Sequence, residues 1–142
     1  MTRPLHTLVL LLVLLLVSGC SIVDFDGGFD DDVEGIVPRI DSFTPKGAYP
    51  VLRNGDPPME FIISGTDDDS FEVDLSWYVG DNLWADDTAS SDDGSFGSNF
   101  SLSYEDAAAE GYEPVEVRFE VTDPDGLSAE NFWWVELDDT AR

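Results

Sequence analysis

Apolar and polar residues alternate in several runs of this chain from residue 39 onward. The clearest run is 115–121, in which valines and a phenylalanine alternate with two glutamates and an arginine. Because successive side chains of a strand point to opposite faces, a period of two predicts strands with one buried and one wet face, as in antiparallel sheets. Similar runs occupy 40–44, 59–63, 73–79 and 100–104. The pattern predicts an all-β fold.

Residues typical of turns separate these runs, at 54–58, 80–82 and 123–126. The segment 86–98 is acidic and rich in small residues, and we expect it to be a loop. One helix-like stretch, 105–110, contains three alanines and is short. Strands at this spacing predict an antiparallel β-sandwich of about seven strands over residues 39–138, followed by a tail at 139–142.

The N-terminal segment has a different pattern. Its apolar run, 8–17, has ten residues, whereas a membrane-spanning helix needs about 20. Arg3 precedes the run and small residues follow it, as in a signal peptide. The small residues before Cys20 resemble the lipobox of prokaryotic lipoproteins, which implies removal of 1–19 and a lipid on Cys20. The alternatives are an unmodified cysteine beside an uncleaved anchor, or an ordinary secretory cleavage site.

The lipobox resemblance implies a protein of the cell envelope, held at a membrane through the lipid on Cys20. Ser21 follows the cysteine. In a sorting rule of some diderm bacteria, an aspartate there favours the inner membrane, so we expect the outer membrane. Residues 20–38 are acidic and have neither a helical nor a strand period, which predicts a flexible tether.

The net charge and the lack of histidine and free cysteine in the mature chain exclude several classes of function. The chain has 31 acidic and six basic residues, a formal charge of −25. Removal of 1–19 takes away Arg3 and leaves 31 acids against five bases, or −26. Nucleic-acid binding is excluded because phosphate contacts need clustered Lys and Arg. With His6 gone and Cys20 modified, zinc sites of His and Cys and Ser-His-Asp catalysis are excluded too.

Two segments resemble a known family. WYVGDN, which begins at Trp77, resembles the W-x-F-G-D-G signature of the immunoglobulin-like PKD domain. The run 115–121 followed by TDPDGLS at 122–128 resembles the closing hairpin of that family, V-x-V-x-D-x-x-G-x-S. The resemblance implies an immunoglobulin-like sandwich that serves in adhesion, spacing or carbohydrate contact, and not in catalysis.

Acidic loops suggest a calcium site. Calcium takes six to eight oxygen ligands, and the acids that we consider for it are Asp67, Asp68, Asp69, Asp123 and Asp125. Alternatives remain open for all of them. Asp-Pro-Asp-Gly is also a common turn sequence, and charge runs are often simply solvated. The sequence does not say whether the two loops lie at the same end of a sandwich. A coat of acids suited to high salt would explain all the clusters without any site.

Aromatic residues near the C-terminus suggest a binding surface. If Trp133 and Val135 face the core, Phe132 and Trp134 share the opposite face, where they could bind a protein or a sugar ring. Alternatively, the loop at 105–114 folds over them. Trp84, in a polar segment, is a further candidate for exposed stacking.

We therefore expect a lipid-anchored binding or structural module without catalytic activity, with an unidentified protein or carbohydrate partner and no cofactor other than Ca²⁺. One alternative is a hydrolase that uses two carboxylates, such as a glycosidase, which needs no histidine. That class needs a concave site on a larger scaffold than about 120 residues provide. The other alternative is a purely structural spacer adapted to high salt.

Overall fold

The computed structural model describes residues 35–140. The predicted signal peptide, Cys20 and most of the predicted tether lie outside this range. The described residues form eight strands and one short helix. In chain order they are β1 (Arg39–Thr44), β2 (Val51–Arg53), β3 (Met59–Thr66), β4 (Glu72–Val79), β5 (Asn82–Ser90), β6 (Ser95–Leu102), α2 (Tyr104–Ala109), β7 (Val115–Thr122) and β8 (Ser128–Asp138).

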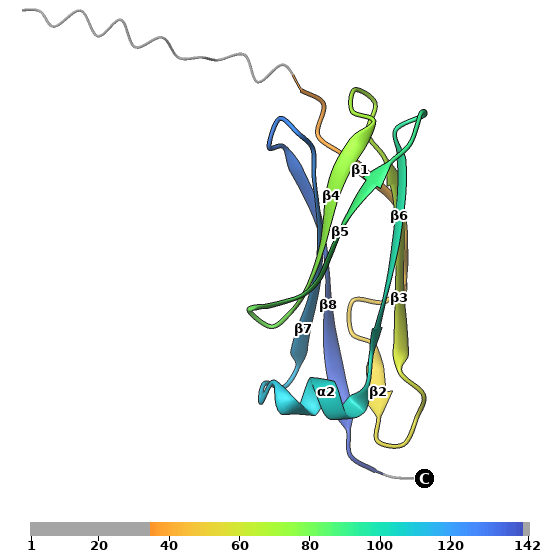
Figure 1. Cartoon of the computed structure of the whole chain (residues 1–142). Coiled ribbons are helices and arrows are strands. Elements are labelled where there is room, and N and C mark those ends of the chain that lie inside the picture. The colour runs from red at the N-terminus through yellow and green to blue at the C-terminus, as the bar shows by residue number, and fades with distance from the viewer. Residues whose placement is uncertain (1–34, 141–142) are drawn as a thin grey trace, which may run out of the picture. The chain divides into compact units, whose positions relative to one another are not determined.

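The strands form two sheets that face each other (Figure 1). One sheet has three strands in the order β1-β3-β6, and the other has five in the order β2-β8-β7-β4-β5. Neighbouring strands are antiparallel except β2 and β8, which run parallel. The predicted all-β sandwich is thus confirmed, and the expectation of purely antiparallel pairing is corrected at the short strand β2.

Alternating residues of the two sheets form the core. All four apolar residues of the run 115–121 are buried, and each such burial contributes on the order of 1.5–3 kcal/mol. Trp77 and Trp133 stack at the centre with 5.9 Å between ring centroids. Their indole N–H groups donate to Ser98 Oγ and to the Pro45 carbonyl, both at 2.8 Å. Within residues 35–140, the buried apolar residues lie between Leu52 and Val135, so a chain that starts at residue 21 keeps this core.

Strands β5 and β6 together occupy most of the segment that the sequence predicts to be a loop, 86–98. Residues 82–90 pair with β4 and 95–102 pair with β3, which leaves only 91–94 as a turn. β5 is an edge strand whose side chains are exposed except for Ala89, which is half-buried. Such a strand has no apolar face to produce a period of two. Its acids also oppose pairing with another chain.

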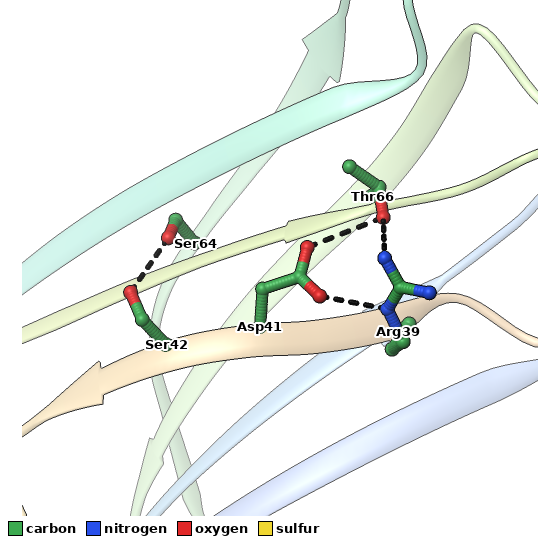
Figure 2. A network of polar contacts seen from close by, with 5 residues as sticks. All are labelled: Arg39, Asp41, Ser42, Ser64 and Thr66. Atoms are coloured by element: carbon green, nitrogen blue, oxygen red, sulfur yellow. Dashed lines mark hydrogen bonds and ion pairs between the residues drawn. The ribbon is translucent and has the colours of Figure 1, made fainter.

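Strand β1 departs from simple alternation because its pairing with β3 shifts between Ile40 and Ser42. The shift lets Ile40 and Phe43 both pack against the core. Figure 2 shows the polar network along these two strands. Arg39 Nε donates to Asp41 Oδ1 at 2.7 Å, and Thr66 Oγ1 donates to Asp41 Oδ2 at 3.2 Å. These bonds fix the end of β3, directly before Asp67.

Helix α2 lies at one end of the sandwich (Figure 1). Ser103 caps its N-terminus, since its Oγ accepts the N–H of Asp106 at 3.1 Å. Ala107 is its buried residue. Within residues 35–140, no helix is long and apolar enough to cross a membrane.

Candidate functional site

Two loops meet at the end of the sandwich opposite α2 (Figure 1). One follows β3 and the other joins β7 to β8, so the question that the sequence left open is answered. The carboxylates of Asp67, Asp69 and Asp123 each place an oxygen within 4.8 Å of the others. We refer to these three residues as the acidic loop cluster.

The two buried members of the cluster use one oxygen each to hold their own loops. Asp67 Oδ1 accepts the backbone N–H groups of Asp69 and Ser70 at 3.2 and 3.3 Å. Asp123 Oδ1 accepts the N–H of Leu127 at 2.8 Å. These are the local bonds that aspartates make in turns. The turn role considered for Asp123 in the sequence is therefore real, but it occupies only half of the carboxylate.

The other oxygen of each buried carboxylate has no hydrogen-bond partner in the described residues. Asp67 is 2% exposed and Asp123 is 4% exposed, and the Oδ2 atoms of both are buried and unpartnered. A buried polar atom without a partner is costly, and a buried carboxylate is more so. Buried polar atoms of this kind are commonly satisfied by an ion or an ordered water.

Asp69, the exposed member, connects the cluster to the start of the domain. Its Oδ2 accepts the backbone N–H of Ile36 at 2.7 Å. Gly35 packs beside the β7–β8 loop, where a Cβ on it would lie 2.6 Å from Leu127 Cδ1. The last residues of the predicted tether thus contact the same end of the sandwich as the cluster.

The electrostatics of the cluster separate two of its carboxyls. Burial raises the pKa of Asp67, and the neighbouring carboxyl of Asp69 raises this pKa further. The Ile36 N–H lowers the pKa of Asp69, and the neighbouring carboxyl of Asp67 lowers it further. A proton shared by these two carboxyls therefore favours Asp67 over Asp69.

A glycine fixes the position of Asp67 from the neighbouring turn. Gly94 has φ +68°, and a Cβ on it would lie 2.0 Å from the backbone oxygen of Asp67. The Asp67 N–H donates to the Gly94 carbonyl at 2.9 Å. The sequence reasoning singled out neither Gly94 nor Ile36. The only signal for Gly94 was its place after two aspartates, which is typical of a turn.

Of the five acids considered for calcium, the structure brings three together. Asp68 and Asp125 are exposed and do not belong to the cluster. The donors that gather are all carboxylate oxygens, which suit hard cations such as Ca²⁺ and not zinc or copper. The three carboxylates supply oxygen ligands of the kind that Ca²⁺ prefers.

The aromatic residues predicted to be exposed fall on two different surfaces. Phe132 and Trp134 lie on the outer face of the five-stranded sheet and are 42% and 37% exposed. Pro114, from the loop expected to cover them, lies beside Trp134 and leaves it partly exposed. Trp84 instead sets its ring against Phe100 of the other sheet, with the centroids 6.1 Å apart.

Comparisons of the chain with protein-family models, with curated proteins and with solved structures found no match. What the acidic loop cluster and the aromatic residues do must therefore be inferred from their own chemistry.

Proposed function

We propose that this protein is a lipid-anchored binding module of the cell envelope, and that one calcium ion stabilises its immunoglobulin-like, PKD-type domain. The observation that carries the calcium site is the pair of buried, unpartnered oxygens on Asp67 and Asp123. The lipid on Cys20 is supported by the signal-peptide pattern of the sequence. The preference for the outer membrane is supported by Ser21, which stands where an aspartate would favour the inner membrane.

The calcium ion would act on stability by joining separate segments. Asp67 belongs to the loop after β3, Asp123 belongs to the β7–β8 loop, and Asp69 holds Ile36. A cation shared by the three carboxylates offsets their mutual repulsion and fixes the point where the tether enters the domain. A ligand that binds only the folded state, at 100 times its Kd, stabilises that state by about 2.7 kcal/mol.

Binding is favoured over hydrolysis by the way the carboxylates are used. A glycosidase needs two carboxyl groups that flank a substrate bond. Asp67 and Asp123 are buried and already accept hydrogen bonds from their own loops. They can share a small cation, but their burial leaves neither of them free to flank a bond of a sugar substrate.

The calcium site is tested on residues 21–142. A chelator first removes any bound metal, and CaCl₂ is then titrated into the protein by calorimetry. We expect one saturable site per chain, lost in Asp123→Asn and retained in Asp125→Asn, which removes the same charge from the same loop. Weak, non-saturable heats that both variants share would instead assign the acids to a coat suited to high salt.

A further inference from the structure

A notch of about 190 Å³ lies on the outer face of the five-stranded sheet, where β4 ends and β7 begins. Its lining residues are Gly80, Asp81, Tyr112, Pro114, Glu116 and Trp134. The acidic loop cluster lies at the opposite end of β7. The seven residue-to-residue steps from Glu116 to Asp123 span about 23 Å at 3.3 Å per step, so the two sites do not overlap.

Strand pairing brings the carboxylate and the indole of the notch together. Glu116 of β7 and Trp134 of β8 are directly paired, which puts their Cβ atoms about 5 Å apart on the same face. The Gly80 N–H donates to the Glu116 carbonyl at 2.9 Å and draws the β4–β5 turn alongside. The indole of Trp134 and the carboxylate of Glu116 are therefore held by the sheet itself.

Tyr112 and Glu110 complete the other side of the notch. A Cβ on Gly80, which has φ +57°, would lie 3.4 Å from Glu110 Oε2 and 3.9 Å from the Tyr112 ring. Asn82 Nδ2 donates to the same Glu110 oxygen at 2.9 Å. Tyr112 is 61% exposed. Its ring is therefore open to a partner, while the ring edge with Cδ2 and Cε2 lies beside Gly80.

The notch is negative, and no basic side chain of residues 35–140 lines it. Among the described residues, the arginines are engaged elsewhere, each with a carboxylate, and Lys46 lies over the Phe43 ring. Asp81 and Glu116 line the notch, and Glu110 borders it. A ligand that complements two aromatic rings and these carboxylates carries a positive charge.

The same sheet face already holds one cation in this manner. The Arg118 guanidinium lies over the Tyr78 ring, 4.1 Å from its centroid, and pairs with Glu130 at 3.0 Å. Arg118 is two residues along β7 from Glu116, and its side chain projects from the same face. The notch, two residues further along β7, combines aromatic rings with a carboxylate in the same way. Its rings are Trp134 and Tyr112, and its carboxylate is Glu116.

We propose that the notch binds one Arg or Lys side chain of a partner protein. The notch is smaller than the 300–1,000 Å³ of sites for whole small molecules. A cation over aromatic rings is attracted by their faces, and a carboxylate beside them adds an ion pair. The net charge of the chain steers basic partners toward it. Sugars fit less well, because the side chains of the lining offer only Tyr112 and Trp134 as hydrogen-bond donors.

This inference names the partner class of the proposed binding module, but it does not depend on the calcium site. The test is a ¹H–¹⁵N NMR titration of residues 21–142 at physiological salt with the peptide acetyl-Gly-Arg-Gly-Arg-Gly-amide. We expect millimolar binding that shifts the Trp134 indole signal and the Gly80 and Tyr112 amides. The citrulline analogue, which is neutral and has nearly the same shape, should bind at least about tenfold more weakly.

Matched variants separate the notch from general attraction by an acidic surface. Glu116→Gln keeps the backbone bond to Gly80 and should weaken the arginine peptide about two- to fivefold, whereas Glu60→Gln, on the other sheet, should not. The unperturbed spectrum of each variant checks its folding. The proposal would be overturned if both variants weakened binding of the arginine peptide equally, or if the peptide shifted the signals of all acidic residues. It would also be overturned if cellohexaose, but not the arginine peptide, shifted the signals of the notch. Asp67→Asn should bind the peptide normally, so failure of the calcium site is seen separately.

Discussion

Asp67 and Asp123 bury their side chains in two different loops at the same end of the sandwich, and each leaves one carboxylate oxygen without a hydrogen-bond partner within residues 35–140. The remaining oxygen of each residue holds its own loop. Two buried carboxylates side by side oppose folding unless a proton or a cation is bound. The stability of the domain should therefore depend on what occupies this cluster.

Asp67→Asn should separate the cost of the charge from the benefit of the cation. The amide oxygen can still accept the N–H groups of Asp69 and Ser70, while the buried negative charge is gone. Without calcium, we expect a melting temperature equal to or above that of the parent chain, and with calcium, no further rise. Thermal unfolding with and without CaCl₂ measures both effects. Asp68→Asn is the control, since it removes the same charge from an exposed neighbour. Identical calcium responses in the two variants would contradict the assignment.

The affinity for calcium should fall as the pH falls. The pKa of Asp67 is raised in the folded state. Without calcium, protonation of Asp67 thus contributes stability that is complete below the unfolded pKa and is lost as the pH rises through the raised folded pKa. Calcium competes with this proton. As the pH falls toward the folded pKa of Asp67, calcium should therefore bind more weakly, and each calcium ion that binds should release more of this proton. Titrations in buffers of different ionisation heat measure the proton release. A calcium Kd independent of pH across the whole range would count against Asp67 as a ligand.

Gly94→Ala should destabilise the domain more than Gly126→Ala. Both glycines have positive φ, but a Cβ at Gly94 would lie 2.0 Å from the Asp67 backbone oxygen, while a Cβ at Gly126 meets nothing within 4 Å. Strain alone costs about 1–2 kcal/mol at each position, and the clash adds to it only at Gly94. Chemical denaturation gives both free energies of unfolding. Equal losses in the two variants would show that the approach of Gly94 to Asp67 is unimportant.

Cys20→Ala should abolish the lipid anchor. If Cys20 carries the lipid, this variant, expressed in a bacterial host, should incorporate no labelled palmitate and should leave the membrane fraction or stay unprocessed. Ser21→Ala is the control, because it leaves the cysteine in place. Lipid labelling that persists in Cys20→Ala would contradict the lipobox interpretation.

The sequence predicts those strands that bury one face, because burial imposes the period of two. β7 and β4 are clear for this reason. The period is lost where burial is lost or the pairing slips. β5 is an exposed edge, β1 contains a register shift at Asp41, and β2 has only three residues and runs parallel to β8.

The candidate site could be predicted only in its residue types. Asp67, Asp68 and Asp69 are three identical neighbours in the sequence. Which of their carboxylates gather is decided by the turn in which Asp67 Oδ1 accepts the N–H groups of Asp69 and Ser70. That the loop of Asp123 lies at the same end follows from strand order, which local patterns do not encode. The contribution of Ile36 comes from a backbone N–H and has no signature in the sequence.

Thermal unfolding of residues 21–142 in CaCl₂, against NaCl of the same and of far higher ionic strength, tests the central claim most directly. At 100 times the Kd, calcium should stabilise the domain by about 2.7 kcal/mol and raise the melting temperature by about 10 °C. The rise should saturate at micromolar to millimolar calcium. A melting temperature that climbs only at molar salt, whatever the cation, would contradict the account and make the acids a coat adapted to high salt.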